Sequence, residues 1–405
     1  MKILFFMTGG FDTHGPSNHL LCALMEDVLK RNISIHLIES HTTGQNADVP
    51  DVLKNFENFS FSVVNSTAVK KTAFVKRYLT YVKYAFKCIK HLKRQKDIYV
   101  VFVQSCPTAP FQVALTKLFV KKPIVYNIQD MFPGSAIVSG VMKRKWTQWL
   151  FSRFHKIAYS NANYISVISD DMKQRVIEQG VPEEKIVTIV DWYDDRSVHE
   201  VKWSKNRFVK KYNLSIEKFY VQYAGTMGFV FDYKMVLNVA ERLKSYKDIE
   251  FHMIGQGSQK NAFIREKEER KLENIVFFPL EPQSMVSDVY SACSICFIPL
   301  KRGIIGNSVP SKVGLLMACN RTIVNSVDED SNYYRMFHQN NMGISASNYN
   351  IDAVTNAILT LYKDKDKRNI FARNSQEFGK NHYARSINTK KYIELFSNVS
   401  NKTEK

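Results

Sequence analysis

Two stretches of this chain begin alike: a short apolar strand runs into a glycine turn, and a helical pattern follows. The first is MKILFFMTGG at residues 1–10, and the second is KFYVQYAGTMG from Lys218. A glycine after a buried strand lets the backbone approach a phosphate closely, and the next helix offers unpaired N–H groups to the anion. The pattern also occurs in α/β proteins that bind no phosphate. Two such openings nevertheless predict two nucleotide-binding α/β units in one chain.

Strands and helices alternate along the chain, which predicts parallel sheets covered on both faces. The 405 residues exceed what one core usually supports, so about two domains are expected. The predicted strands are residues 3–7, 33–39, 98–104, 124–128, 165–169, 186–190, 219–224, 249–254, 275–278, 295–300 and 322–327. Helices are predicted over 20–29 and from Asp352 onward. A polar stretch from Asp194 to Lys211 interrupts the pattern, so we place the domain boundary between residues 193 and 194.

The formal net charge of +19 calls for anionic partners, and its distribution narrows the choice. Between Lys70 and Lys96 there are ten Lys or Arg and no acidic residue, interleaved with apolar residues at helical spacing. A second basic and aromatic patch lies between Lys143 and Lys156, with Trp146 and Trp149. Each patch has two interpretations: a solvated face over an ordinary core contact, or a surface that docks on anionic lipid.

Other sequence features indicate the cellular compartment. No apolar run approaches the roughly 20 residues that span a bilayer, and the run from Ile3 to Met7 is too short for a signal peptide. The six cysteines show no framework spacing, which fits reduced thiols in a cytosol. Cys293 and Cys296 form a CxxC without a second pair, which gives little support for a metal or redox site. We therefore expect a cytoplasmic protein.

Candidate ligand-binding residues follow the predicted strands, because ligands of open α/β sheets collect beyond the carboxyl ends of the strands. In the second half these positions include the turns at Gly225 and Gly255 and the loop KRGIIGNSVPSK at residues 301–312. This loop precedes an apolar helix, so it predicts exposed amides at a helix start, which suit a diphosphate. Lys312, Lys301 or Arg302 could add positive charge there. The alternative is a plain capped loop.

Several motifs, taken in order, resemble a known family. They are QDMFP at 129–133, DWYD at 191–194, GTMG at 225–228, GQG at 255–257, VPSK at 309–312 and MACN at 317–320. The series resembles retaining GT-B glycosyltransferases. More narrowly, it is similar to the branch that builds bacterial surface polysaccharides, including transferases of N-acetylfucosamine type.

The resemblance implies two Rossmann-like domains that face a central cleft. The first domain, 1–193 joined by a C-terminal helix over 383–398, would bind the acceptor, and the second, 194–382, would bind a nucleotide sugar. The diphosphate would lie between the first glycine turn and the loop before Lys312, with base and ribose near Gly255 and Leu280. The donor-binding residues expected are Gly9, Gly10, Gly225, Thr226, Met227, Lys234, Gly255, Leu280, Asn307, Ser308, Val309, Pro310, Ser311 and Lys312.

The chain also departs from the family pattern. Relatives carry two glutamates ahead of the MA motif, and the matching positions here are Asn307 and Leu315. Asn307 can still hydrogen-bond a sugar hydroxyl, whereas Leu315 cannot. The basic residue that relatives carry after the GTMG turn is also absent, and Lys234 is the nearest candidate. These changes point to a different donor sugar, a different phosphate grip, or lost activity.

Breaking a bond between an anomeric carbon and a diphosphate develops negative charge on the leaving group, which positive charge and amide dipoles stabilise. No DxD-like or His-rich cluster suggests a metal, so we expect no cofactor.

Asp130, after the predicted strand 124–128, is the candidate catalytic carboxylate, which would orient the acceptor hydroxyl or support the positive sugar ring. Its alternative role is to cap the turn before Pro133. His14 is a candidate for acceptor or sugar contact, or is merely exposed.

These observations predict a retaining glycosyltransferase that moves a sugar from a nucleoside diphosphate to a surface glycan, as in lipopolysaccharide or capsule synthesis. The expected acceptor is a polyprenyl-diphosphate-linked saccharide, and the basic surfaces predict peripheral attachment to the inner, anionic face of the cell membrane. One alternative is a sugar-nucleotide epimerase of the same fold. Another is a nucleic-acid-binding protein, which the charge permits but no motif supports; we expect no nucleic-acid partner.

Overall fold

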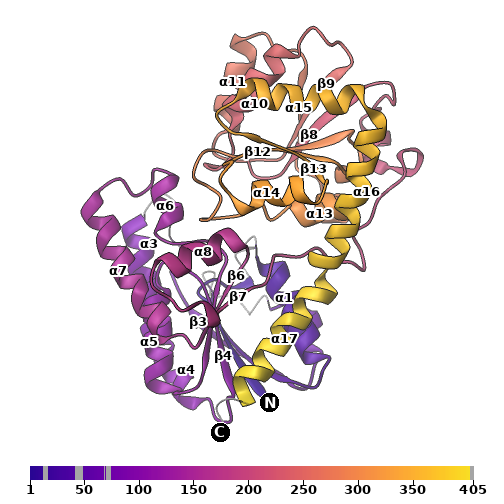
Figure 1. Cartoon of the computed structure of the whole chain (residues 1–405). Coiled ribbons are helices and arrows are strands. Elements are labelled where there is room, and N and C mark those ends of the chain that lie inside the picture. Colours follow the sequence, from indigo (N-terminus) through magenta and orange to yellow (C-terminus); the bar gives the residue numbers. More distant parts are fainter. Residues whose placement is uncertain (12–16, 42–48, 68, 70–73, 402–405) are drawn as a thin grey trace. The chain divides into compact units, whose positions relative to one another are not determined.

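The computed structural model describes residues 1–11, 17–41, 49–67, 69 and 74–401, and the chain forms two compact α/β units (Figure 1). Unit 1 comprises residues 1–190 together with the C-terminal segment from Asn388, and unit 2 comprises residues 191–387. Within the described ranges, no helix combines the length and the apolar character that crossing a membrane requires.

Unit 1 contains a parallel sheet, with seven strands among the described residues, in the order β3-β2-β1-β4-β5-β6-β7. Its strands are β1 (Lys2–Phe6), β2 (Ser34–His41), β3 (Phe59–Asn65), β4 (Val100–Gln104), β5 (Ile124–Ile128), β6 (Tyr164–Val167) and β7 (Ile186–Thr188). Its helices are α1 (Asn18–Leu29), α2 (Asp51–Lys54), α3 (Phe74–Lys87), α4 (Ile89–Arg94), α5 (Ala109–Phe119), α6 (Gly134–Val138), α7 (Lys145–Asn161) and α8 (Asp170–Glu178). The order of the strands reverses between β1 and β4, the topological switch point of this sheet.

Unit 2, which is described throughout, has a six-stranded parallel sheet in the order β10-β9-β8-β11-β12-β13. Its strands are β8 (Phe219–Ala224), β9 (Ile249–Ile254), β10 (Ile275–Phe278), β11 (Ile295–Pro299), β12 (Ile323–Val327) and β13 (Gly343–Ser347). Its helices are α9 (Arg207–Lys211), α10 (Tyr233–Arg242), α11 (Lys260–Glu269), α12 (Val286–Ser291), α13 (Val313–Ala318), α14 (Asn332–Gln339), α15 (Ile351–Lys363) and α16 (Lys365–His382). Here the switch point lies between β8 and β11.

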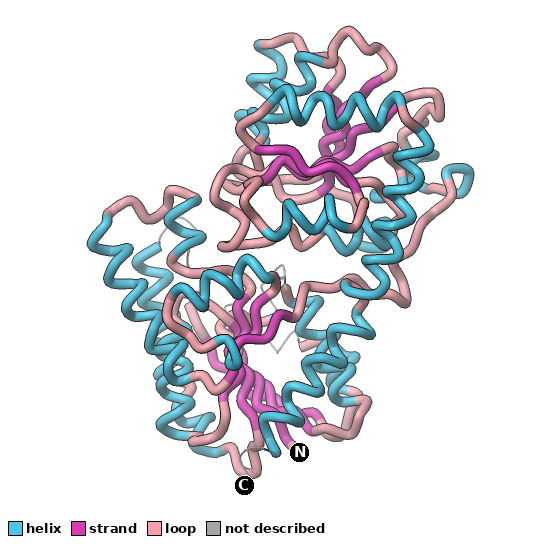
Figure 2. The backbone as a smooth tube through the Cα atoms, in the orientation of Figure 1, coloured by secondary structure: helices cyan, strands magenta, loops and turns pink. Residues whose placement is uncertain are grey.

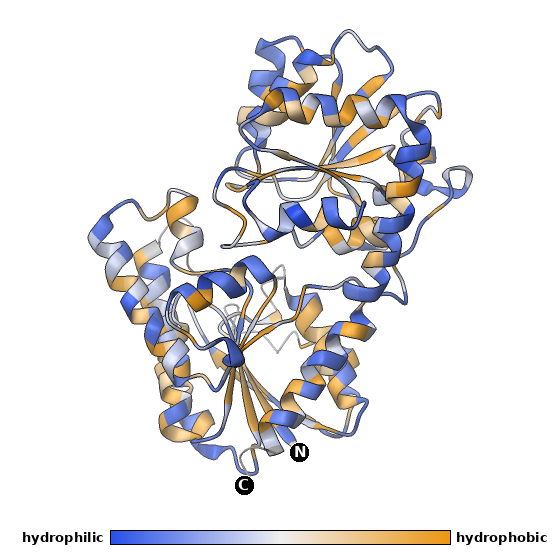
Figure 3. Ribbon diagram, viewed as in Figure 1, coloured by the Kyte–Doolittle hydropathy of each residue, from blue (hydrophilic) through white to orange (hydrophobic). Residues whose placement is uncertain are grey.

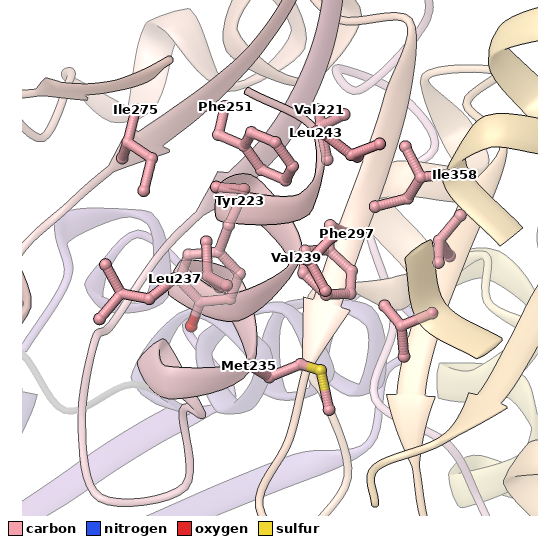
Figure 4. Packing of buried hydrophobic residues seen from close by; sticks show 14 of the residues in the cluster. Val221, Tyr223, Met235, Leu237, Val239, Leu243, Phe251, Ile275, Phe297 and Ile358 are labelled. Atoms are coloured by element: carbon pink, nitrogen blue, oxygen red, sulfur yellow. The ribbon is translucent and has the colours of Figure 1, made fainter. Parts of the chain in front are cut away.

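Burial explains why the strands form the centre of each unit. The strands are mostly apolar, whereas the helices show one apolar and one polar side (Figures 2 and 3). In unit 2, Val221, Phe251 and Phe297 from three strands pack against α10 and α15 in one core (Figure 4). Such burial contributes roughly 1.5–3 kcal/mol per large side chain.

The last helix, α17 (Arg385–Asn401), carries the chain from unit 2 back to unit 1. Its Phe396 is fully buried against Phe5 and Phe102 of the unit 1 sheet, and the Tyr392 hydroxyl donates to Asn127 Oδ1 at 3.0 Å. Where the helix begins, Tyr193 forms a β-bridge with Ala384. Both residues belong to unit 2, so this bridge joins the first and the last segments of that unit.

Every strand predicted from the sequence is present, with shifts of a few residues at the ends. Two strands at sheet edges, β3 and β13, were not predicted. β13 reads GISAS, whose small and polar residues give little strand signal. β3 reads FSFSVVN, and its alternation of apolar and polar residues was a signal that the prediction missed.

The apolar stripe of the first basic patch packs inward. Tyr78 of α3 contacts Phe151 of α7 edge to face at 5.2 Å, and Ala85 and Leu92 are fully buried. This part of the stripe is therefore a core contact under a charged face, the first of the two interpretations. The outward apolar residues of the basic patches are others, chiefly Val75, Leu79, Phe86, Trp146 and Trp149.

Candidate functional site

The candidate site of unit 2 lies at the carboxyl ends of β8 and β11, on either side of the switch point. In parallel sheets the loops that leave two such strands diverge, and the crevice between them is where ligands bind. Here the loops are the turn that begins at Gly225 and the segment 301–312. The predicted donor-binding residues of the second half gather mainly on these two loops.

The backbone conformation of Gly225 favours glycine, and the side chain of Lys312 lies in the space that a Cβ there would enter. Its φ is +146°, and a Cβ built there would lie 1.6 Å from Lys312 Nζ. Gly255, with φ of +131°, is held equally close, since its Cβ would lie 2.1 Å from the Gly225 carbonyl oxygen. Gly255 therefore acts by letting the turns after β8 and β9 pack together.

Lys312 carries the positive charge of the site. Its Nζ donates to the Tyr223 hydroxyl at 3.1 Å and lies 4.4 Å from the centre of the same ring. The Tyr223 hydroxyl in turn donates to the Thr226 carbonyl at 2.7 Å, which leaves its lone pair for the ammonium. Burial lowers the pKa of Lys312 to about 8. The geometry thus holds a desolvated cation that a phosphate would complement.

Hydrogen bonds within the loop 301–312 fix its course. The Gly303 N–H donates to Asp328 Oδ1 at 2.9 Å, and Asn307 Nδ2 donates to the Gly303 carbonyl at 2.9 Å. Asn307 is buried, and its amide NH₂ group already donates to the Gly303 carbonyl. The sequence suggested this side chain as a hydrogen-bond partner for a sugar hydroxyl, and its bond to Gly303 occupies part of its donor capacity. The helix after the loop, α13, has only six residues, so its dipole is weak and the charge of Lys312 matters more.

The remaining predicted donor residues differ in exposure. Met227 is fully buried in the unit 2 core, and its N–H and carbonyl are bonded to Gln256 and Gln259, so it shapes the turn and offers no side chain to a ligand. Thr226, Lys234, Leu280 and Ser311 are exposed, and Ser308, Val309 and Pro310 are half-buried. Leu315, at the position of a family glutamate, is half-buried in α13.

Two further lysines lie at this edge. Lys260 Nζ donates to the Gly255 carbonyl at 2.9 Å, and Lys301 Nζ donates to Gln259 Oε1 at 3.0 Å. Lys301 was one of the cations considered, whereas Lys260 and Tyr223 were missed. Lys260 could have been found, because it follows the GQG motif by three positions and begins α11.

Unit 1 has its own cluster of polar groups at the switch point of its sheet. Thr8 Oγ1 lies 3.0 Å from Cys106 Sγ, which follows β4. The Phe11 N–H donates to Glu39 Oε2 at 3.1 Å, and Glu39 Oε1 lies 2.8 Å from His41 Nε2. Glu39 and His41 are completely buried at the end of β2. This pair contacts the backbone just after the glycine turn, at Phe11, and it was not predicted from the sequence.

The predicted residues of unit 1 lie at the same edge. Gly9 is exposed, and the buried Gly10 accepts a hydrogen bond from Asn18 Nδ2 at 3.1 Å. Asp130 is exposed just beyond β5, ahead of the cis peptide bond that joins Phe132 to Pro133. His14 lies outside the described residues, so the structure does not locate it.

The CxxC motif is buried in unit 2, where Cys293 Sγ and Cys296 Sγ lie 3.5 Å apart as free thiols. Burial and the neighbouring Cys293 hold the pKa of Cys296 well above its usual range. Across the described part of the chain, no three His, Cys, Asp or Glu side chains gather closely enough to hold a metal ion.

Two family models match the chain, one mainly in each unit. Residues 204–378 match the model of the glycosyl transferases group 1 family, and residues 62–192 match the glycosyl transferase 4-like domain.

Two curated bacterial proteins are similar to the chain. WbjE of Pseudomonas aeruginosa, named as a probable glycosyltransferase, is 23% identical over 220 residues, which is 54% of each chain. WcaI of Escherichia coli K12, named as a colanic acid biosynthesis glycosyl transferase, is 25% identical over 214 residues, or 52% of each chain. The chain matches about half the length of these relatives.

Solved structures show the same fold over nearly the whole chain. HepE of Anabaena in complex with UDP has a TM-score of 0.73 at 13% identity and covers 98% of this chain and 100% of its own. WaaG, a glycosyltransferase involved in lipopolysaccharide biosynthesis, has a TM-score of 0.68 at 11% identity and covers 98% and 99%. At such identities the likeness establishes the fold alone, which is GT-B, as predicted from the sequence.

Proposed function

We propose that this chain is a retaining glycosyltransferase of bacterial surface polysaccharide synthesis, such as lipopolysaccharide or capsule. It transfers a sugar from a nucleoside diphosphate to a growing glycan. The observation that carries the proposal is the desolvated ammonium of Lys312 over Gly225, at the switch point of a group 1 glycosyltransferase unit. The bacterial relatives and the HepE structures with UDP and with UDP-glucose support a nucleotide-sugar donor.

In the proposed reaction, the bond between the anomeric carbon and the β-phosphate oxygen breaks as the acceptor hydroxyl attacks from the same face of the sugar. Negative charge then grows on the departing diphosphate, and the Lys312 ammonium stabilises this charge. The interaction is strong because the ammonium is partly shielded from water. The departing phosphate oxygen accepts the proton of the acceptor hydroxyl. Asp130 orients that hydroxyl from unit 1, and Lys234 offers a further cation beside the donor.

We further propose that the acceptor is a saccharide on a polyprenyl diphosphate and that the protein attaches peripherally to the anionic inner face of the cell membrane. Trp146 and Trp149 of α7 are each 61% exposed, next to Lys143, Arg144 and Lys145. Exposed indoles beside basic residues suit the boundary between lipid headgroups and acyl chains.

An epimerase of the same fold is less well supported, because the matched family models and the curated relatives are glycosyltransferases. The test incubates the protein with a panel of nucleotide sugars, with and without a lipid-linked acceptor. Transfer predicts release of nucleoside diphosphate and a heavier lipid product only when both substrates are present. Isomerised donor without acceptor would instead establish an epimerase, and neither product across the panel would refute the proposal.

A further inference from the structure

Unit 1 contains a groove between the end of β3 and the helix α3. Residues 65–67 form one wall, and Lys76, Thr80, Lys83 and Lys87 lie along the other, around a cavity of about 220 Å³. We call this feature the lysine groove. Since all strands of the sheet are parallel, the end of β3 lies at the same edge as the ends of β1 and β5, where Gly9 and Asp130 follow.

The helix presents its lysines along one line. Lys76, Thr80, Lys83 and Lys87 follow each other at intervals of four, three and four residues, so they share one face of α3. The helix is fixed by Tyr84, which is buried and donates its hydroxyl proton to the Met7 carbonyl at 2.5 Å. Lys87 Nζ donates to the Asn65 carbonyl at 3.1 Å, which holds one ammonium at the end of the groove.

The charged side chains that line the lysine groove, among the described residues, are all positive. Among the described residues that line it there is no Asp or Glu, and no acidic residue occurs between Lys70 and Lys96 in the sequence. Three ammonium groups therefore line the groove together with the hydroxyls of Ser66 and Thr67, whereas the Thr80 hydroxyl donates to the Lys76 carbonyl at 2.9 Å. Hydrogen-bond donors of this kind, with positive charge but no fork geometry, suit phosphate oxygens.

Apolar side chains lie next to these charges. Leu79 lines the groove and is 53% exposed, and Val75 on the neighbouring turn of α3 is 69% exposed. A ligand that fits both features has an anionic head joined to an apolar chain. A nucleotide sugar has the head without the chain, and a free glycan has neither.

We propose that the lysine groove binds the diphosphate that links the acceptor glycan to its polyprenyl chain. The inference rests on the proposed function and adds the residues that recognise this class of acceptor. The ammonium groups of Lys76, Lys83 and Lys87 hold the diphosphate. The glycan then extends along the carboxyl edge of the sheet, and the first isoprene units contact Leu79 and Val75.

The test compares two triple variants with equal loss of charge. The first variant removes the three positive charges of the lysine groove and is Lys76→Gln/Lys83→Gln/Lys87→Gln. Lys117→Gln/Lys121→Gln/Lys122→Gln changes three exposed lysines of unit 1 near the amino end of β5, at the opposite edge of the sheet. The KM is measured for a polyprenyl-diphosphate-linked saccharide and for the same saccharide as an uncharged octyl glycoside.

The groove variant should raise the KM for the diphosphate acceptor by roughly 10- to 100-fold, because three charged contacts to the diphosphate are lost. The KM for the octyl glycoside and for the donor should stay within about twofold, and the control variant should match the wild type on both acceptors. A Lys76→Arg/Lys83→Arg/Lys87→Arg variant keeps the charge and should restore most of the affinity.

Equal KM values for the two triple variants would overturn the inference. So would an equal rise for both acceptors, or a loss of binding to anionic phospholipid vesicles without a change in the acceptor KM, which would assign the lysines to lipid headgroups. Titration with farnesyl diphosphate separates this question from the proposed function: the wild type should bind it and the groove variant should not, even if no sugar is transferred. Equal binding by both proteins would also refute the site.

Discussion

Replacing Lys312 by methionine tests two effects of its buried charge: the loss of folding stability that the charge causes, and the binding of the diphosphate that it supports. Burial lowers the pKa of Lys312 from 10.5 to about 8. At ~1.4 kcal/mol per pKa unit, the charged form costs the folded protein about 3 kcal/mol at pH 7. Methionine is unbranched and of similar length, so it can fill the same space over Gly225 without the charge. The variant should therefore be more stable than the wild type.

The size of this stabilisation depends on pH, because the protonation state of Lys312 differs between the folded and the unfolded protein. Below pH 8 the lysine is charged in both the folded and the unfolded state, and its full cost is present. Between pH 8 and 10.5 only the unfolded state holds the proton, so the cost shrinks, and above pH 10.5 it is gone. The stabilisation by Lys312→Met should follow the same course.

Calorimetric unfolding at pH 7 and at pH 10.5 measures this difference. At pH 7 the unit 2 transition should rise by roughly 4–10 °C, equivalent to about 2–3 kcal/mol, and the gain should nearly vanish at pH 10.5. Lys244→Met, an exposed lysine of the same unit, serves as the control and should change little. The same Lys312→Met protein should bind UDP at least about tenfold more weakly. A variant no more stable than the wild type at pH 7, or equally stabilised at both pH values, would refute the reasoning.

Three other changes test neighbouring parts of the account. The affinity of the wild type for UDP should fall as the pH rises above about 8, where Lys312 loses its proton, and titration calorimetry of Lys312→Arg should show no such fall. Gly225→Ala should weaken UDP binding at least about tenfold because its Cβ would displace Lys312, whereas Gly228→Ala, whose Cβ meets its nearest neighbour at 3.5 Å, should bind normally. Asp130→Asn should lower kcat by about 10²-fold with the donor affinity unchanged, and an unchanged kcat would remove Asp130 from the mechanism.

The strands of both sheets could be predicted from the sequence because burial on both faces leaves nearly continuous apolar runs. The run Phe219–Ala224 is an example, since every one of its residues is buried. The edge strand β13 has a partner strand along one edge only, and its small and polar residues, GISAS, carry no such signal.

The glycine turn and Lys312 were both recognised in the sequence, but their contact was not. They lie 87 positions apart, and only the packing of the loop 301–312 against the end of β8 brings Lys312 Nζ over Gly225. The burial of Glu39 and His41 was missed for a related reason. Charged residues at the end of a strand usually mark the surface, and here the turn at Phe11 covers them.

The central claim is that the carboxyl edge of the unit 2 sheet grips a nucleoside diphosphate through Lys312. A crystal structure with the nucleoside diphosphate that binds most tightly in titration tests it directly. We predict a phosphate oxygen within hydrogen-bond distance of Lys312 Nζ, beside the turn at Gly225. A diphosphate bound elsewhere, with Lys312 still on the Tyr223 hydroxyl, would contradict the account.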